Sequence, residues 1–271
     1  MLTLQLEQKK VDLAQFVKRS AMESDYSRLI SESCMILDAE GKVKVLYFEL
    51  GEAFDTQEVI WALQTIKYST STRTSGLKTT SAIFGYSPRV TIRRDFCTST
   101  SMATKQRQQH EIICDFGKKL AEIYQEFIPN MYKVHEEATR AKVKDEWIIE
   151  GTPFTSGIVN KNNPLKYHFD SGNFKGVYSN MVVFKKSVEG GYLSCPEYDL
   201  AFELKNNSIL MFDGQSILHG VTPIRRLRPD AYRYSIVYYS LQGMWKCETV
   251  GEELARIKKV KTQREHKRLT L

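Results

Sequence analysis

The sequence has few cysteines and few histidines. This scarcity argues against a domain held together by disulfides and against one built around a structural zinc ion. Its 271 residues include five cysteines, an odd number, with no Cys-x-x-Cys pair among them. We therefore expect neither a disulfide framework nor a structural zinc module, and this cysteine usage indicates a reducing, intracellular compartment. The five are Cys34, Cys97, Cys114, Cys195 and Cys247.

Long apolar runs are also missing. Residues 1–10 have no apolar signal core, and no run approaches the length needed to span a bilayer. The chain has no internal repeat and no low-complexity linker, and its 42% hydrophobic and 11% aromatic residues can bury a substantial core. These features predict one soluble intracellular domain over residues 1–271, in the cytoplasm or the nucleus, that does not contact a membrane.

Positive charge gathers in two segments. The net charge is +7, and residues 251–271 carry seven Lys or Arg against three Glu, with apolar residues at helical spacing. The stretch from Lys67 to Arg94 has six basic residues and no acidic one, around a Ser/Thr-rich segment. Such stretches favour a polyanionic partner, although most charge runs are solvated surface. The sequence predicts a basic C-terminal helix over residues 250–271.

Two of the five histidines fall at a spacing that suits a metal site. In His168-x-Asp170 the side chains are two residues apart, so at a strand end they project to the same side. His219 lies far enough along the chain for intervening strands to turn back and deliver a third ligand. Two imidazoles and one carboxylate leave three metal positions open, as in non-haem Fe(II) oxygenases. Each residue taken singly is more often structural; their combination with a downstream arginine predicts iron.

That arginine, Arg233, lies in an aromatic and β-branched run over residues 232–239 that indicates a strand. Arg233 and Ser235 share a face of this strand, and a guanidinium beside a hydroxyl suits a carboxylate. This pair is what 2-oxoglutarate would need, with O2 taking the last position on the iron. Arg93 or Arg94 is a further candidate for contacting 2-oxoglutarate, but nothing local singles either out.

The hydrophobic pattern changes near residue 146. Before it, helices are predicted over residues 3–33, 58–68 and 109–138, the last interrupted near Pro129, and two strands over 34–37 and 43–48. After it, short β-rich runs punctuated by turn residues dominate, which is typical of a sandwich or barrel. With the metal ligands placed near strand ends, we predict an α+β fold: an N-terminal α/β elaboration (1–145), a double-stranded β-helix (jelly-roll) core (146–245) and flanking helices.

Five motifs between residues 152 and 239 carry a family resemblance; they lie at 152–157, 168–173, 190–193, 219–223 and 233–235. They resemble the TET/JBP dioxygenases, which are nucleobase oxidases that depend on iron and 2-oxoglutarate. The resemblance implies Fe(II) held by His168, Asp170 and His219, and 2-oxoglutarate held by Arg233 and Ser235. It also implies double-stranded DNA as the partner, with the target base flipped out of the helix.

The resemblance further implies two substrate contacts. Asn173 would face the cofactor and the target base, and Tyr239 would stack on the flipped base; the alternatives are a turn-forming asparagine and an ordinary core tyrosine. TET-like enzymes that act on cytosine carry a histidine two residues after this aromatic, where this chain has Leu241. The expected reaction is therefore oxidation of the 5-methyl group of 5-methylcytosine or thymine to the 5-hydroxymethyl form, with further oxidation on repeated turnover.

Two other functions stay open from the sequence. The same iron centre would serve a protein or small-molecule hydroxylase. The fold without chemistry would serve as a DNA-binding module that works through its basic segments, although the intact His168, Asp170 and His219 set argues against this.

Overall fold

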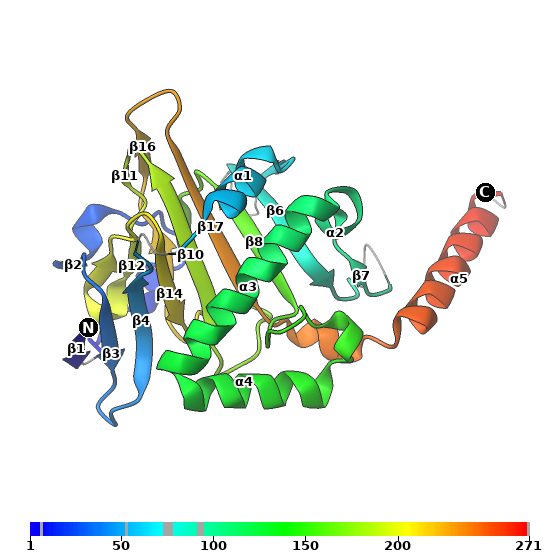
Figure 1. Cartoon of the computed structure of the whole chain (residues 1–271), viewed down its shortest axis with the longest axis horizontal. Helices are drawn as coiled ribbons and strands as arrows, with labels where there is room; N and C mark the ends of the chain where they lie inside the picture. Colours follow the sequence, from blue (N-terminus) through cyan, green and yellow to red (C-terminus); the bar gives the residue numbers. More distant parts are fainter. Residues whose placement is uncertain (6–7, 52–53, 73–77, 91–94, 270–271) are drawn as a thin grey trace.

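The computed structural model describes residues 1–5, 8–51, 54–72, 78–90 and 95–269 (Figure 1). Its strands are β1 (Leu2–Gln5), β2 (Arg28–Ile30), β3 (Cys34–Leu37), β4 (Val43–Glu49), β5 (Ser69–Thr72), β6 (Lys78–Ser87), β7 (Thr98–Ser99), β8 (Ser156–Lys161), β9 (Leu165–His168), β10 (Ser179–Lys186), β11 (Val188–Gly190), β12 (Leu193–Cys195), β13 (Leu200–Phe202), β14 (Ser208–Phe212), β15 (His219–Val221), β16 (Ile224–Arg226) and β17 (Tyr232–Tyr239). The α-helices are α1 (Gln57–Thr65), α2 (Ser101–Lys105), α3 (Arg107–Phe127), α4 (Pro129–Lys142) and α5 (Val250–Leu269). Short 3-10 helices are η1 (Leu13–Gln15), η2 (Glu23–Asp25), η3 (Asp145–Trp147), η4 (Pro196–Tyr198) and η5 (Gln242–Lys246). The fold is thus a mixed α+β one, as predicted.

Two sheets form the centre of the molecule. The larger has ten strands in the order β1-β3-β4-β14-β10-β17-β8-β6-β5, with β7 beside β6, and the smaller has the order β2-β13-β12-β15-β9. Strands β11 and β16 form a separate ribbon. One buried cluster joins the two larger sheets, since it contains Val183 and Leu210 of the ten-stranded sheet and Leu193 and Phe202 of the five-stranded sheet. The two sheets therefore face each other.

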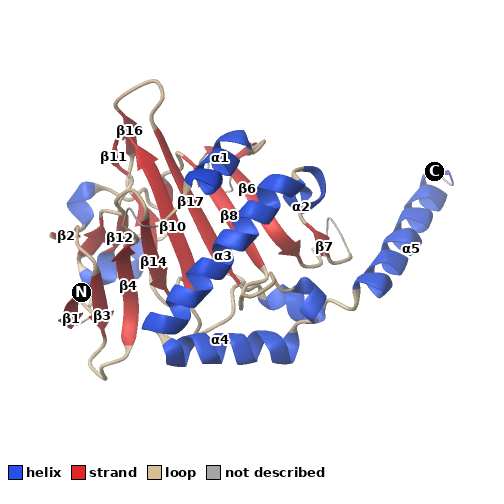
Figure 2. Ribbon diagram, viewed as in Figure 1, coloured by secondary structure: helices blue, strands red, loops and turns tan. Residues whose placement is uncertain are grey.

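Helices cover the other face of the ten-stranded sheet, where Figure 2 shows α3 crossing the strands and α4 running along their ends. The alternation of side chains along β17 produces this layering: Tyr234, Ile236 and Tyr238 pack in the core that includes α3. The break between α3 and α4 falls at Pro129, as predicted, because proline lacks the amide that a continuing helix needs. Odd-numbered residues of β17 point instead toward the smaller sheet.

The prediction of a helix over residues 3–33 is wrong. This segment contains β1, β2 and two short 3-10 turns, and both strands pair in parallel with partners elsewhere, β1 with β3 and β2 with β13. Sheet edges supplied by distant parts of the chain therefore override the local helical pattern. The expected division at residue 145 is also no boundary in the sheets, because β4 pairs with β14 and β6 pairs with β8.

The structure also pairs two cysteines that we expected to be free. Cys97 and Cys247 form a disulfide that joins positions 150 residues apart, whereas Cys34, Cys114 and Cys195 are free thiols. The sequence spacing could not indicate this pair, because the two cysteines meet only when η5 folds back beside the segment before β7. No helix in the described part of the chain is long and apolar enough to span a membrane.

Candidate metal centre and co-substrate pocket

The smaller sheet places His168 and His219 directly opposite each other. His168 ends β9, His219 begins β15, and the two are register partners in this antiparallel pair. Directly opposed residues point to the same face of a sheet, and the ring centroids lie 4.5 Å apart. Asp170 follows the end of β9, where its amide donates a 2.8 Å hydrogen bond to the carbonyl of Gly214. All three side chains thus converge, as predicted.

Backbone hydrogen bonds determine which imidazole nitrogen faces this cluster. Nδ1 of His168 lies 2.8 Å from the carbonyl oxygen of Lys166, and Nδ1 of His219 lies 2.9 Å from that of Ile217. A carbonyl only accepts, so each Nδ1 carries the proton and each Nε2 keeps its lone pair. Those Nε2 atoms lie 3.5 Å (His168) and 3.8 Å (His219) from Oδ1 of Asp170. The arrangement orients three donor atoms toward one point.

Burial keeps His219 in the neutral form that a metal requires. The residue is 5% exposed, and this burial lowers its imidazole pKa to about 4, against the opposing attraction of Asp170. A neutral imidazole need not release a proton before it binds a cation.

The donor set fits Fe(II). Donor atoms of His168, Asp170 and His219 all lie within 4.8 Å of one another, and within the described residues no other group of three His, Cys, Asp or Glu side chains is close enough to hold a metal ion. Two imidazole nitrogens and one carboxylate, without thiolates, match the composition of a facial triad. The hydrogen bonds that both Nδ1 atoms donate fix the orientation of the two imidazole rings, as metal-binding histidines need.

A cavity of about 290 Å³ between the two sheets contains these residues at its wall together with Arg233 and Ser235. Arg233 is 2% exposed, and its Nε and Nη2 have no hydrogen-bond partner within the described structure. Burial lowers the guanidinium pKa to about 10, so the group stays protonated at neutral pH. A buried cation without a counter-ion is unfavourable. It therefore forms a site for an anion, and the carboxylate of 2-oxoglutarate fits it.

Glycine makes room for this guanidinium. Gly191 has φ +70°, and a Cβ on it would lie 2.8 Å from both Cδ and Nε of Arg233. Its amide donates to the carbonyl of Pro223 at 3.0 Å. The Gly190-Gly191 pair is therefore needed both for a left-handed turn and for close approach to the arginine.

The two predicted substrate contacts also line the cavity. Tyr239 ends β17 six residues after Arg233, about 20 Å away along an extended strand. Asn173 forms an isolated bridge with Leu241, and its Nδ2 donates to Oγ of Ser179 at 3.2 Å. Asn173 therefore has a structural contact as well as a face on the cavity. Arg93 and Arg94 lie outside the described residues.

Sequence reasoning missed two residues of this site. Asn160 on β8 is the register partner of Ser235, lines the cavity and accepts a hydrogen bond from Asn163 at 3.1 Å. Glu197 on η4 is 2% exposed and accepts the amide of Leu218 at 2.7 Å, which supports the strand that carries His219. Neither position has a local signal, because Asn160 acquires its role through the pairing of β8 with β17, and Glu197 through a side-chain hydrogen bond to a later segment of the chain.

Comparison with known proteins identifies the family. The Tet/JBP family, described as the oxygenase domain of the 2OGFeDO superfamily, matches residues 86–242. The chain belongs to this family. As a Tet/JBP oxygenase domain, it is of the class of Fe(II)- and 2-oxoglutarate-dependent dioxygenases, which agrees with the donor set and with the unpaired Arg233.

Relatives of this Tet/JBP domain are much longer proteins. Thymine dioxygenase JBP1 of Trypanosoma brucei brucei is 26% identical over 234 residues, which cover 84% of this chain and 27% of the relative. The bifunctional helicase and thymine dioxygenase JBP2 of the same organism is 33% identical over 132 residues, covering 48% of this chain and 12% of the relative. The chain thus spans about a quarter or less of the length of these relatives.

Among solved structures, NgTET1 in complex with 5mC DNA has a TM-score of 0.60 and 16% identity, covering 86% of this chain and 90% of that one. A 2OG-Fe(II) oxygenase family oxidoreductase from Burkholderia pseudomallei has a TM-score of 0.50 and 12% identity, covering 89% and 100%. At this level of identity the likeness concerns the fold.

Proposed function

We propose that this Tet/JBP domain oxidises the 5-methyl group of a pyrimidine base in DNA, and that thymine is the base. The observation that carries the proposal is the shared cavity, which has His168, Asp170 and His219 in its wall together with the unpaired guanidinium of Arg233. The relatives named as thymine dioxygenases support the choice of substrate.

In this proposal His168, Asp170 and His219 hold Fe(II), and Arg233 with Ser235 holds the far carboxylate of 2-oxoglutarate. When bound, iron with 2-oxoglutarate and O2 supplies the oxidising power that replaces a methyl C–H bond by C–OH while 2-oxoglutarate is converted to succinate and CO2. Arg233 neutralises the carboxylate and fixes its orientation through a planar fork of donors. Burial of Arg233 and His219 between the two sheets limits the access of water to that part of the cavity.

The opposite end of the cavity would receive the base. Tyr239 offers a ring for stacking, and Asn173 offers its amide to the edge of the base. Leu241 lines the same region and presents no donor or acceptor, so this position lacks the histidine that the resemblance associates with cytosine. A base within a duplex cannot reach such a cavity, so we propose double-stranded DNA with the target base flipped out.

The architecture is part of the proposal. The two facing sheets would form a double-stranded β-helix, and residues 1–271 would act as one oxygenase domain, since strands from both halves of the chain build each sheet.

The test is incubation of the iron-loaded protein with 2-oxoglutarate, O2 and duplexes that carry thymine or 5-methylcytosine, followed by nucleoside mass spectrometry. We expect thymidine to gain one oxygen, with one succinate per product. Asp170→Ala should abolish both signals, whereas Asp230→Ala, at an exposed aspartate paired with Lys186, should leave them unchanged.

Each alternative has its own signature. Oxidation of 5-methylcytosine alone would overturn the thymine assignment and keep the DNA reaction. Succinate that forms without any modified nucleoside would point to a protein or small-molecule substrate. If Asp170→Ala purified without metal still turns over, the reaction does not depend on the proposed iron site.

A further inference from the structure

The C-terminal helix α5 stands away from the two-sheet body, as Figure 1 shows in red. At 20 residues it is about 30 Å long. Apart from buried Glu253, its described residues are exposed or half-buried, and Leu254 is 53% exposed. Packing against the body therefore does not explain why the chain continues as a long helix.

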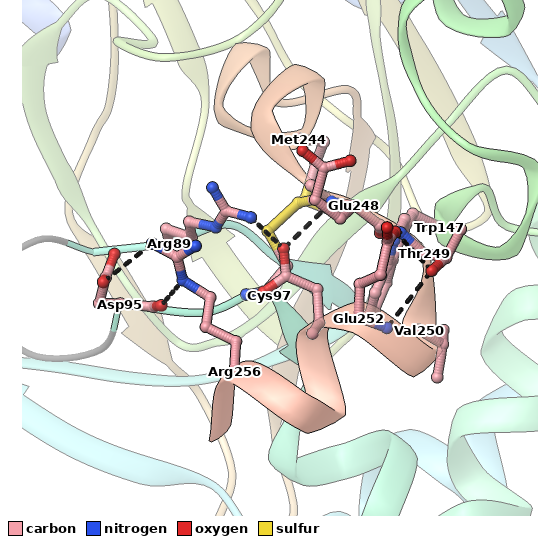
Figure 3. Close-up of polar contacts among 12 residues, drawn as sticks. Arg89, Asp95, Cys97, Trp147, Met244, Glu248, Thr249, Val250, Glu252 and Arg256 are labelled. Carbon is pink, nitrogen blue, oxygen red and sulfur yellow. Dashed lines mark hydrogen bonds and ion pairs between the residues drawn. A yellow bond between two sulfur atoms is a disulfide. The ribbon is translucent and has the colours of Figure 1, made fainter. Parts of the chain in front are cut away.

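The base of this helix is nevertheless firmly attached (Figure 3). Glu253 is 1% exposed; its carboxylate pairs with Arg89 and accepts hydrogen bonds from the amides of Cys97 at 2.8 Å and Glu248 at 3.1 Å. Arg256 pairs with Asp95 at 3.0 Å. The Cys97–Cys247 disulfide fastens the residues just before the helix to the same segment. These contacts give the exposed part of α5 a defined direction.

These contacts also revise the expectation for the upstream basic stretch. Of its six basic residues, Arg73, Arg93 and Arg94 lie outside the described residues, Arg89 is committed to Glu253, and Lys67 and Lys78 are exposed. The described part of this stretch therefore offers an anion two exposed lysines, fewer than α5 does.

Beyond its base the helix presents unpaired lysines. Lys258, Lys259 and Lys261 are exposed, and no described acidic side chain forms an ion pair with any of them. Positions 258 and 261 are three residues apart and share one face, with 259 beside them. A row of ammonium groups without counter-ions suits a polyanion.

The segment that leads to α5 starts at the cavity wall. Leu241 lines the cavity, and η5 follows it directly. In η5, Trp245 is 39% exposed, its ring centroid lies 5.0 Å from that of Phe174, and Nζ of Lys142 lies 4.1 Å from it. An exposed aromatic ring with a lysine over it therefore lies in the segment that connects the cavity wall to α5.

We propose that α5 is a DNA-binding arm, in which Lys258, Lys259 and Lys261 contact the phosphate backbone of the duplex whose base enters the cavity. The inference rests on the proposed function for the choice of polyanion. Phosphate contacts of this kind are independent of sequence and position the duplex rather than select the base.

The test compares two variants of the full chain that lose the same charge. The arm variant combines Lys258→Gln, Lys259→Gln and Lys261→Gln. The control combines Lys10→Gln, Lys18→Gln and Lys42→Gln, exposed residues of the N-terminal part. The N-terminus and strands β1 and β3 of this part lie at the opposite end of the molecule from α5 in Figure 1. Binding of a fluorescein-labelled duplex is measured by anisotropy over a range of salt concentrations, and thermal melting checks that each variant is folded.

We expect the arm variant to bind about ten- to a hundredfold more weakly near physiological salt, with the slope of log K against log salt reduced by up to about 2.7, or 0.9 for each lost phosphate contact. The control should bind like the natural sequence. A chain that ends at Ile257 should lose at least as much affinity, because it also lacks Arg264, Lys267 and Arg268, while the contacts at the base of the helix remain.

The outcomes separate this inference from the proposed function. If the arm variant binds the duplex with the affinity and the salt slope of the natural chain, α5 is not a DNA-binding arm, even if the natural chain oxidises thymine. Binding that depends on the arm, without any oxidised nucleoside, would support the arm and overturn the reaction. A natural chain that binds no duplex at low salt would overturn both.

Discussion

The Cα of Gly214 faces the carboxylate of Asp170 at a distance that leaves no room for a side chain. A Cβ on Gly214 would overlap Oδ2 of Asp170 and lie 3.0 Å from its Cγ. The carbonyl of the same glycine accepts the amide of Asp170 at 2.8 Å. Gly214 thus both holds the backbone of the proposed ligand and makes space for its side chain.

Gly214→Ala should therefore weaken iron binding without unfolding the protein, because the aspartate side chain is the part that can move. We expect Fe(II) affinity to fall about ten- to a hundredfold, the range seen when the support of a metal ligand is lost. Anaerobic titration with Fe(II) measures this. Gly251→Ala is the matched control, since nothing lies within 4 Å of a Cβ placed there; equal affinity in the two variants would contradict the positioning role.

Arg233 should make the ligand-free protein less stable than an apolar residue at the same position would. Its buried charge has no counter-ion among the described residues, so Arg233→Met should raise the free energy of unfolding by about 1–3 kcal/mol. The same variant should lose the stabilisation by 2-oxoglutarate, which for the natural chain is about 2.7 kcal/mol at a hundred times the dissociation constant.

Denaturant unfolding with Mn(II), with and without 2-oxoglutarate, measures both effects of Arg233→Met. Arg226→Met, at an exposed arginine of β16, should show neither. A methionine variant that is less stable than the natural chain, or that is still stabilised by 2-oxoglutarate, would show that the guanidinium is not an anion site.

Leu241 should decide between bases. A histidine at this position would supply the hydrogen-bonding group that the apolar side chain lacks, and one hydrogen bond amounts to about a tenfold preference. Leu241→His should therefore raise oxidation of 5-methylcytosine relative to thymine by about tenfold, measured in a duplex that contains both. Leu241→Met should retain the original ratio; if both variants shift it equally, loss of packing rather than base recognition is responsible.

Glu253 should make stability depend on pH. Burial alone would raise its pKa, but the hydrogen bonds from Arg89 and from the amides of Cys97 and Glu248 outweigh burial and lower it. A carboxyl group whose pKa is lower in the folded state contributes stability above its unfolded value of about 4.3, and this contribution is lost as the pH falls through the lowered value.

Glu253→Gln should consequently lower the free energy of unfolding by about 3 kcal/mol at pH 7, since it leaves Arg89 without its partner. The difference from the natural chain should shrink as the pH falls below about 4. Glu265→Gln, at an exposed position of the same helix, serves as the control. A constant difference at every pH would attribute the effect to packing.

The sequence by itself was enough to predict the chemistry of the site. Residue types and spacing predicted that His168, Asp170, His219 and Arg233 form the site. The strand period of two places both members of His-x-Asp on one face, and likewise Arg233 and Ser235. The aromatic and β-branched run over residues 232–239 located β17, and Pro129 located the break between α3 and α4, since these features depend on neighbours in the chain. The role of each residue in binding iron or 2-oxoglutarate stays a prediction.

Only the tertiary structure decided how distant segments combine. The edge strands within residues 3–33, the Cys97–Cys247 disulfide, the clearance of Gly214 at Asp170 and the clamp of Glu253 on Arg89 all join residues that are far apart in sequence. Their energies come from pairing and packing between elements, which local pattern does not encode. Distance in sequence therefore separates what could be predicted here from what could not.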